Sequence, residues 1–415
     1  MQDHFLNRFK TIRSRTEQIC KPLKTEDYVV QPIVDVSPPK WHLGHTTWFY
    51  ENFLLVPFLD NYPLFHTDFN YVFNSYYESV GARVLRTDRG NLSRPTIDEV
   101  YQYRAHVNQY MEQLIQSEKG KLENVHFTLE MGLNHEQQHQ ELLMYDIKYI
   151  LGNNPLFPVY LEDTSPIESN LKATAMTFET IQEGVYTIGH EGDGFHFDNE
   201  KGVHKVYLNP FEISNRLVTN REYLEFIEAG GYAFFQFWLA EGWDWVNANQ
   251  IKAPEYWHKI DGQWHAYTLS GLQPIELEAP VTHISFFEVD AYARWKGMRL
   301  PTEFEWEIAA KQLGKIKDNC FVESGRLDPV VQSAEGQHYF GSLWEWTSSA
   351  YSPYPNYTPP DGALGEYNGK FMINQMVLRG GSIATPENHY RPTYRNFFHP
   401  HLRWLFNGFR LAKSL

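Results

Sequence analysis

Two histidines one helical turn apart are the residues of this sequence best suited to chemistry. His135 and His139 lie within one run, 134–139, with Glu136 between them. Residues four apart share a face of a helix, so both imidazoles would point the same way. Imidazole binds zinc, iron, copper or nickel, so the pair could hold one transition-metal ion. The run also matches H-E-x-x-H, the zinc-protease pattern in which the glutamate is the general base. The third possibility is a pair of surface histidines with no metal.

Four segments in the first third of the chain carry apolar residues at helical spacing and would position these histidines. They cover about residues 4–23, 41–58, 96–114 and 122–151. Ser37 precedes two prolines and is the expected N-cap of the second helix. Thr96 and Glu99 form a possible capping box at the third. Four helices with one long irregular connection predict a four-helix bundle, whose metal sites are built from side chains that project into the core.

A further histidine, His45, lies on the apolar face of the second predicted helix together with Trp48, Phe49 and Phe53. A buried histidine usually finds a hydrogen-bond partner in the core, and this role is more common than metal binding. The position of His45 therefore leaves both roles open.

The sequence changes character after the fourth predicted helix. Gly152-Asn153-Asn154-Pro155 is an ordinary helix stop, and the next twenty or so residues predict a connector. From about residue 176, short β-like runs alternate with glycine, asparagine and proline turns. Examples of these runs are 185–188, 205–208 and 376–381, and two short helices are expected at 220–229 and 287–296.

Composition restricts the class of protein. A length of 415 residues predicts two domains or three, and the net charge of −15 argues against nucleic-acid and anionic-membrane partners. The sequence contains no long apolar segment, so no transmembrane helix is expected. The N-terminal residues lack the apolar core of a signal peptide. Only Cys20 and Cys320 are present, so a disulfide framework is not expected and a cytoplasmic location is favoured.

Seven motifs in the last two thirds of the chain resemble the formylglycine-generating-enzyme (sulfatase-modifying-factor) fold. They are G-V-Y-T-I-G at 184–189, F-D-N-E at 197–200, V-T-N-R-E-Y at 218–223, R-L-P-T-E-F-E-W-E at 299–307, W-E-W-T at 344–347, R-G-G-S at 379–382 and G-F-R-L at 408–411. The resemblance implies a compact C-type-lectin-like domain over about residues 176–415. The true formylglycine generators use two cysteines in this part, and with Cys320 alone that activity is not expected.

The first third of the chain resembles the DinB family, whose bundles bind a metal through three histidines. The similarity lies in W-H-L-G-H at 41–45 and in the histidine pair of the fourth helix. A DinB bundle followed by a formylglycine-generating-enzyme-like domain is the architecture of the ergothioneine-biosynthesis sulfoxide synthases (EgtB-type). The runs F-N-S-Y-Y-E at 73–78 and Y-R-N-F-F-H-P at 394–400 resemble the branch of that family that uses free cysteine.

The resemblance implies a multidomain α+β protein. A DinB-like four-helix bundle would occupy residues 1–152 and a connector residues 153–175. A C-type-lectin-like mixed α/β domain would occupy residues 176–415.

The resemblance also implies an Fe(2+) site formed by His45, His135 and His139, with open positions for O2 and a substrate thiolate. Neutral ligands suit this task, because the thiolate brings the negative charge that a carboxylate supplies in a 2-His-1-carboxylate site. The family reaction joins hercynine (N-α-trimethylhistidine) to cysteine and gives hercynyl-cysteine sulfoxide. Hercynine, cysteine and O2 are therefore the expected small-molecule partners.

Other residues take roles at this site by the same resemblance. Gln138 matches a position that hydrogen-bonds the substrate imidazole. Tyr77, and after it Tyr76, is the candidate proton donor. The trimethylammonium group of hercynine has no N–H donor, so aromatic rings and weak acceptors are its natural partners. The matching residues are Asn396, Phe397 and Phe398, with Trp404 as a looser candidate.

Two arginines follow the tyrosine pair in the irregular loop. Arg83 and Arg86 are candidates for the carboxylate of cysteine, because a guanidinium can pair with a carboxylate through two hydrogen bonds. Solvated loop charges are the alternative interpretation.

Several other functions compete with this one. A zinc hydrolase would use Glu136 as its base and would leave the last two thirds of the chain without a role. A selenoneine-type or ovothiol-type synthase would have the same iron site and different substrates. A lectin-like binding module on a bundle that has lost its metal is the alternative that is not an enzyme.

Overall fold

The computed structural model describes residues 2–162, 172–315, 321–329, 331–332 and 339–415. Two compact units make up the chain. The helical unit holds residues up to Leu161 together with Gly362–Glu366, and the mixed unit holds Glu162–Asp361 and Tyr367–Leu415. Cys320 and part of the predicted connector, 163–171, lie outside the described residues.

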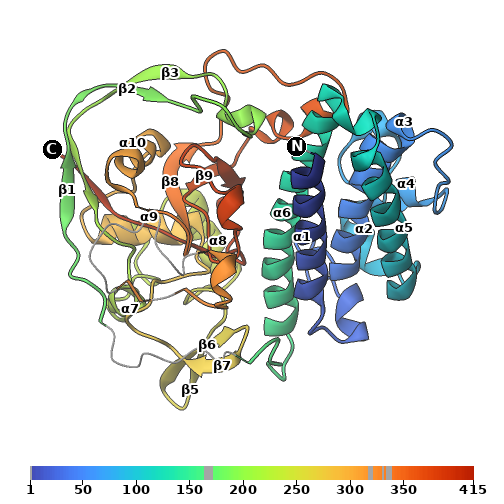
Figure 1. Ribbon diagram of the computed structural model, residues 1–415. Helices are drawn as coiled ribbons and strands as arrows, with labels where there is room; N and C mark the ends of the chain where they lie inside the picture. The colour runs from blue at the N-terminus through green and yellow to red at the C-terminus, as the bar shows by residue number, and fades with distance from the viewer. Residues whose placement is uncertain (1, 163–171, 316–320, 330, 333–338) are drawn as a thin grey trace. The chain divides into compact units, whose positions relative to one another are not determined.

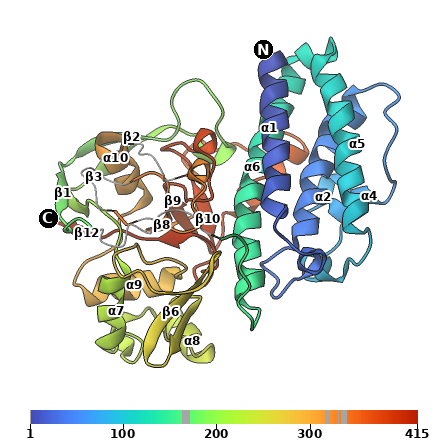
Figure 2. The same ribbon diagram turned by 60° about the horizontal axis from the view of Figure 1, so that its bottom comes forward.

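Four long helices form the helical unit, as predicted. They are α1 (Gln2–Cys20), α2 (Pro39–Tyr50), α5 (Ile97–Gln116) and α6 (Glu123–Gly152), and they lie side by side in Figures 1 and 2. The second predicted helix does run to Phe58, but it changes its hydrogen-bond pattern on the way. A π-helical turn, η2 (Glu51–Leu55), follows α2 and leads into a single turn, α3 (Val56–Phe58).

The long connection between α3 and α5 holds only short turns. They are α4 (Phe69–Phe73), η3 (Glu78–Val80) and η4 (Arg86–Asn91). The remaining turns of the unit are η1 (Thr25–Val29), η5 (Lys119–Lys121) and η9 (Ala363–Glu366). No strand or long helix holds this connection, so its conformation depends on individual side-chain contacts.

One of the two predicted helix starts is confirmed and the other is wrong by one residue. Thr96 and Glu99 form the expected capping box, with the Glu99 N–H 3.2 Å from the Thr96 hydroxyl and the Thr96 N–H 2.6 Å from the Glu99 carboxylate. At α2 the N-cap is Pro38, not Ser37. The Ser37 hydroxyl, one residue before the N-cap, instead accepts a hydrogen bond from the Arg89 guanidinium at 2.8 Å.

A buried ion cluster joins α1, α5 and α6. The Glu136 carboxylate is fully buried and lies 3.1 Å from the Arg13 guanidinium and 3.2 Å from that of Arg104. Thr16 is its third partner, and the Thr16 hydroxyl donates a hydrogen bond to the carboxylate at 2.7 Å. Burial acts to raise the pKa of Glu136, but Arg13 and Arg104 hold that pKa below its usual value. Glu136 is therefore an ionised core residue.

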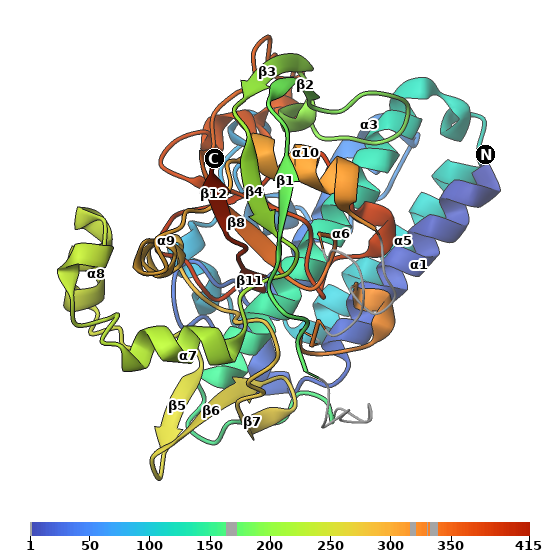
Figure 3. The same ribbon diagram turned by 90° about the vertical axis from the view of Figure 1, so that its left-hand side faces the viewer.

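Over its described residues, the mixed unit combines small sheets with four helices. One sheet has the strand order β1 (Phe178–Ile181), β4 (Phe211–Ser214) and β12 (Ala412–Ser414), and a second has the order β10 (Asn396–Phe398), β9 (Met376–Arg379), β8 (Trp344–Ala350) and β11 (Asn407–Gly408). A third sheet pairs β2 (Gly184–Ile188) with β3 (His204–Leu208). The fourth has the order β5 (Trp257–Ile260), β6 (Gln263–Thr268) and β7 (Gly271–Pro274). Neighbouring strands are antiparallel except β11 and β8, which are parallel. Figure 3 shows β1, β4 and β12 side by side.

Two of the four helices in this unit were predicted from the sequence. α7 (Asn220–Glu228) and α9 (Phe286–Trp295) are confirmed, whereas α8 (Ala240–Ala248) and α10 (Glu303–Leu313) were missed. The short turns are η6 (Asp198–Glu200), η7 (Phe235–Phe237), η8 (Val322–Ser324), η10 (Gly369–Phe371) and η11 (Glu387–His389). Most of the residues of α10 are buried, so its apolar positions show little of the periodicity that reveals an amphipathic helix.

Buried ion pairs link the motifs of the mixed unit to one another. The Arg410 guanidinium lies 2.8 Å from the Glu345 carboxylate, and Arg379 pairs with Glu307 on α10. These four side chains are at most 1% exposed. Removing one partner of such a pair would leave an uncompensated buried charge. Buried ion pairs between four of the motifs that resemble the formylglycine-generating-enzyme fold therefore stabilise the mixed unit.

Within the described residues, no helix is both long enough and apolar enough to cross a membrane.

Replacement of Glu136 by glutamine tests the buried cluster. The change removes the only carboxylate within ion-pair distance of Arg13 in the described residues, so this buried guanidinium is left uncompensated, and it leaves Arg104 with the partly exposed Glu17 at 3.3 Å as its remaining carboxylate partner. We expect the free energy of unfolding of the metal-free protein to fall by about 3–5 kcal/mol. Urea denaturation followed by far-UV circular dichroism measures this change.

Glu130→Gln is the matched control on the same helix. Glu130 pairs with Arg8 at 2.6 Å, but both side chains are 23% exposed, so we expect a loss of no more than about 1 kcal/mol. Equal losses for the two variants would contradict a special role for the buried cluster.

Candidate metal centre

Three histidine side chains from α2 and α6 converge inside the helical unit. His45 lies on α2, and His135 and His139 lie on α6. One ring nitrogen from each lies within 4.8 Å of the other two. His45 and His135 are at most 2% exposed, and His139 is 9% exposed. The structure thus brings together the three histidines predicted as ligands.

Hydrogen bonds to the outer ring nitrogens determine which nitrogens face the centre. The Nδ1 of His45 lies 2.7 Å from the carbonyl oxygen of Phe73, which can only accept, so this nitrogen carries the proton. The Nε2 of His45 is then an acceptor, and it lies 3.2 Å from the Nε2 of His135. The lone pair of the His45 Nε2 therefore points toward the Nε2 of His135. One metal cation could be bound by both of these nitrogens.

His42 and Asp146 fix the proton of His139 in the same way. The Nε2 of His42 donates to the Asp146 carboxylate at 2.8 Å, and in a neutral His42 ring the Nδ1 is then an acceptor. The Nδ1 of His139 lies 2.9 Å from it and therefore donates, which leaves the Nε2 of His139 for a ligand. Sequence reasoning missed this pair. Helical spacing was the signal that could have revealed it. His42 precedes His45 by three residues and Asp146 follows His139 by seven, so each shares a helix face with a candidate ligand.

Burial keeps the three imidazoles neutral. It lowers the pKa of His135 to about 3, against a smaller opposing effect of Glu136. Burial also lowers the pKa values of His45 and His139 well below the usual range, and repulsion by His135 lowers them further. A neutral imidazole is the form that binds a metal, so the site needs no deprotonation at neutral pH.

Two indoles hold His45 between them. The ring of Trp41 stacks on His45 at 4.5 Å and 10°, and the ring of Trp48 lies at 5.4 Å and 17°. Gly44 allows Phe73 to approach, because a Cβ at this position would lie 2.1 Å from the Phe73 ring. Gly44, the small residue in W-H-L-G-H, therefore lets the Phe73 carbonyl come close enough to bond the Nδ1 of His45.

The glutamate of the H-E-x-x-H run does not share the face of the histidines. Successive residues of a helix point about 100° apart, and Glu136 is bound by Arg13 and Arg104 in the ion cluster of the bundle core. A zinc-protease base must reach a water on the metal. The alternative of two surface histidines without a metal is wrong, because His135 and His139 are buried, as is Glu136 between them.

The predicted tyrosine pair lies one aromatic layer away from His45. Tyr77 is fully buried and packs on Trp48 at 5.5 Å and on Phe53 at 5.3 Å. Tyr76 stacks on Tyr77 at 4.7 Å and is less buried. Tyr77 is thus separated from His45 by the Trp48 ring, and the role of either tyrosine as proton donor stays a prediction.

Three arginines of the following loop differ in their surroundings. Arg83 pairs with the exposed Glu78, and the exposed Arg86 donates to a backbone carbonyl at 2.5 Å. Arg89, which sequence reasoning missed, is only 6% exposed, and its guanidinium lies 3.3 Å from the centre of the Trp41 ring. No carboxylate of the described residues lies within ion-pair distance of Arg89. Burial lowers its pKa well below the usual value.

The remaining predicted residues lie on α6 and on β10. Gln138 is partly exposed on α6. Phe397 stacks on Tyr351 at 4.1 Å, and Phe398 meets Trp404 edge to face at 5.5 Å. Asn396 bonds the N–H of Phe397 through its own side-chain oxygen at 2.9 Å. The β10 residues belong to the mixed unit, and their contact with a shared substrate stays a prediction.

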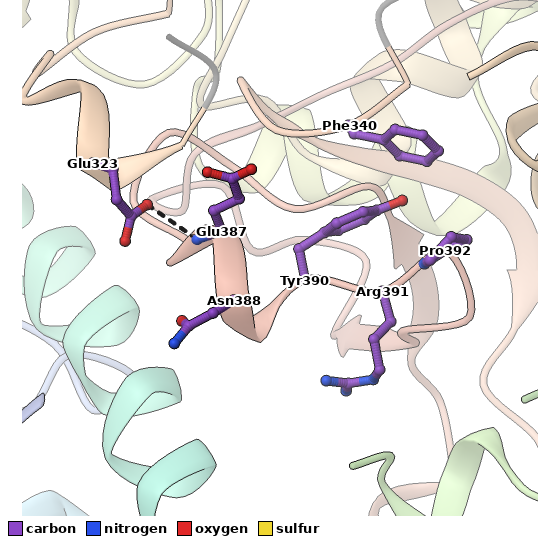
Figure 4. A pocket seen from close by; sticks show the side chains of 7 residues that line it. All are labelled: Glu323, Phe340, Glu387, Asn388, Tyr390, Arg391 and Pro392. Atoms are coloured by element: carbon purple, nitrogen blue, oxygen red, sulfur yellow. Dashed lines mark hydrogen bonds between the residues drawn. The ribbon is translucent and has the colours of Figure 1, made fainter. Parts of the chain in front are cut away.

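A separate cavity of about 650 Å³ lies in the mixed unit (Figure 4). Its lining residues are Glu323, Phe340, Glu387, Asn388, Tyr390, Arg391 and Pro392. Two of its charged groups already have partners: Glu323 accepts from the Glu387 N–H at 3.0 Å, and Arg391 pairs with Glu200 at 2.6 Å. None of the lining residues was predicted as a site residue.

Comparisons with known proteins agree with both domain predictions. Residues 8–143 match the DinB superfamily, and residues 164–339 and 336–415 match the sulfatase-modifying factor enzyme 1-like domain. Hercynine oxygenase of Mycolicibacterium smegmatis is 31% identical over 69% of this chain and 71% of the relative. Hercynine oxygenase of Mycobacterium tuberculosis is 30% identical over the same shares. Ergothioneine biosynthesis protein 1 of Schizosaccharomyces pombe is 29% identical over 53% of this chain and 28% of its own length.

These similarities cover both units in the predicted order, and the three converging histidines lie within the region that matches DinB. The chain belongs to the hercynine oxygenase family of ergothioneine biosynthesis, with a DinB-type helical domain followed by a sulfatase-modifying-factor-like domain.

Proposed function

We propose that this protein is an iron(II)- and O2-dependent sulfoxide synthase that joins hercynine to cysteine. One observation carries the proposal: three neutral, buried imidazoles converge in a chain that belongs to the hercynine oxygenase family. In the overall reaction, hercynine loses a C–H hydrogen and cysteine loses its S–H hydrogen as the C–S bond forms. One oxygen atom of O2 ends on sulfur and the other leaves as water, so atoms and electrons balance.

The donor set fits a divalent iron ion. His45, His135 and His139 would be the ligands, and all three are neutral. Bound there, iron(II) would supply the redox chemistry with O2 and a place for the substrate thiolate. The neutral ligands leave the metal's positive charge to be balanced by that thiolate. His42, Asp146 and the Phe73 carbonyl hold two of the rings in the tautomer that this requires.

Arg89 is the arginine best placed for the carboxylate of cysteine. Its guanidinium stacks on Trp41, which in turn stacks on His45. A buried cation without a carboxylate partner is costly, and a bound anion would relieve that cost. Arg83 and Arg86 remain candidates from the sequence, but Arg83 is paired with Glu78 and Arg86 is exposed.

Hercynine recognition is assigned to Gln138 and to the β10 residues. Gln138 would hydrogen-bond the substrate imidazole and so turn one carbon toward sulfur, a positioning effect. Phe397 stacks on Tyr351 at 4.1 Å and more loosely on Phe371 at 6.0 Å, so it would offer hercynine the edge of an aromatic cluster. Phe398 and Trp404 form an aromatic corner that suits the trimethylammonium group, and a good cation–π contact contributes about 0.5–2 kcal/mol. Asn396 adds a weak acceptor.

Tyr77 is the proposed proton donor, with Tyr76 as the second candidate. A phenol has a pKa near 10 and donates effectively only when hydrogen-bonded to the atom on which negative charge develops. The burial of Tyr77 excludes water from its surroundings, which favours such a directed transfer.

The direct test is an aerobic reaction that offers hercynine with equal amounts of cysteine, γ-glutamylcysteine and a selenosugar to iron-loaded protein. We expect hercynyl-cysteine sulfoxide to be the main product by mass spectrometry, with O2 consumed above the cysteine-only background. A main product that contains selenium would favour the selenoneine-type alternative. No uptake above background would refute the synthase.

Replacement of Tyr77 by phenylalanine should divert turnover from C–S bond formation. Without the phenol proton, oxidation of cysteine to its sulfinic acid should gain relative to sulfoxide formation by about 10²-fold, the usual size of a lost general acid. Product ratios are read by mass spectrometry, with Tyr71→Phe as the control because Tyr71 is 50% exposed. An unchanged ratio in Tyr77→Phe would rule Tyr77 out and leave Tyr76.

Replacement of Arg89 by glutamine should weaken cysteine binding through the carboxylate. We expect the KM for cysteine to rise by about 10- to 100-fold, since charged hydrogen bonds contribute about 1.5–3 kcal/mol. Cysteamine lacks the carboxylate, so its KM should be nearly the same in wild type and variant. Equal penalties for both thiols would show that Arg89 acts only on the structure.

A further inference from the structure

A short segment from late in the chain belongs to the helical unit. Gly362–Glu366 clusters with residues up to Leu161, and η9 (Ala363–Glu366) forms part of this segment. Glu366 contacts the connection that carries the tyrosine pair. We propose that Glu366 is a positioning residue that fixes the loop of Tyr77, and thereby the phenol of that tyrosine. This inference rests on the function proposed above.

The carboxylate of Glu366 accepts three hydrogen bonds at one place. The backbone N–H of Glu78 lies 3.0 Å from it, the backbone N–H of Ser79 lies 3.1 Å from it, and the Ser79 hydroxyl lies 2.7 Å from it. These are the first two N–H groups of η3, which begins directly after Tyr77. The first N–H groups of a helical turn have no partner within the turn, and a carboxylate is a strong acceptor for them.

The other contacts of Tyr77 act on its carbonyl and its ring. The Tyr77 carbonyl accepts from the Asn74 amide at 3.1 Å and from the Val80 N–H at 3.2 Å. Its ring packs against those of Trp48 and Phe53. Glu366 therefore fixes the backbone just after the tyrosine, and Asn74 fixes the backbone at the tyrosine itself.

Loss of Glu366 should loosen this loop without unfolding the domain. Glu78 and Ser79 lie at the surface, so their freed N–H groups can bond to water. The helices of the bundle do not depend on this contact. A misplacement of about 1 Å can nevertheless cost about 10²-fold in a positioned reaction. The expected consequence is a change in product ratio with little change in iron content.

Two measurements test this inference on Glu366→Ala and Glu366→Gln. The first is amide hydrogen exchange of metal-free protein, read on peptides that cover residues 76–80. We expect exchange there to become at least about tenfold faster in the alanine variant and less so in the glutamine variant, which keeps one acceptor. The second is the ratio of sulfoxide to sulfinic acid, which should fall about 5- to 50-fold in Glu366→Ala.

The double variant Tyr77→Phe/Glu366→Ala separates positioning from a general defect. If Glu366 acts through the phenol, the double variant should show the same product ratio as Tyr77→Phe alone. A further fall in the double variant, or an unchanged ratio in Glu366→Ala, would overturn the proposal.

Glu323→Ala is the matched control. Glu323 also accepts the first N–H of a short turn, that of Glu387 in η11, but it does so in the mixed unit. The Glu323→Ala variant should speed amide exchange only around Glu387 and should leave the ratio of sulfoxide to sulfinic acid unchanged. If the wild type forms no sulfoxide, the proposed function fails, and the exchange experiment still decides the inference. Unchanged exchange at residues 76–80 in Glu366→Ala would then overturn it.

Discussion

The packing of α2 against α6 is the contact on which the rest of the site depends. It buries three imidazoles in one place, and burial keeps them neutral. α6 uses two faces for two purposes. His135 and His139 point to the centre, and Glu136, about 100° away, is held by the two buried arginines of the ion cluster. The same run of residues thus supplies the candidate ligands and fastens their helix to α1 and α5.

Hydrogen bonds around the histidines give the centre its chemical character. The Phe73 carbonyl and the His42–Asp146 pair place protons on the outer nitrogens of His45 and His139. A neutral donor set would leave the positive charge of a bound iron for an anionic substrate. Arg89 stacks on Trp41 and Tyr77 packs on Trp48, and both indoles stack on His45, so a cation and a phenol each lie one aromatic ring away from this histidine.

Much of the fold follows from sequence periodicity and motifs. The four long helices, the Thr96 capping box and two helices of the mixed unit were predicted because their local signals are strong. Family resemblance, and not spacing, singled out His45, because a histidine on an apolar face has several common roles. α10 was missed because most of its positions are buried and its apolar residues show no clear period.

Other features could not be predicted because they depend on contacts between distant residues. Ser37 had the right type for an N-cap, but Arg89 takes its hydroxyl. The partners of Glu136 come from α1 and α5, and nothing near it in the sequence indicates burial. The contact of Glu366 with the turn after Tyr77 joins residues separated by most of the chain. Local patterns carry no information about such pairs.

Anomalous diffraction at the iron edge, from crystals loaded with iron(II) under anaerobic conditions, tests the central claim most directly. The account predicts one peak about 2.0–2.3 Å from a ring nitrogen of each of His45, His135 and His139, with Glu136 still bound to Arg13 and Arg104. A peak elsewhere, or a metal ligated by Glu136, would contradict it.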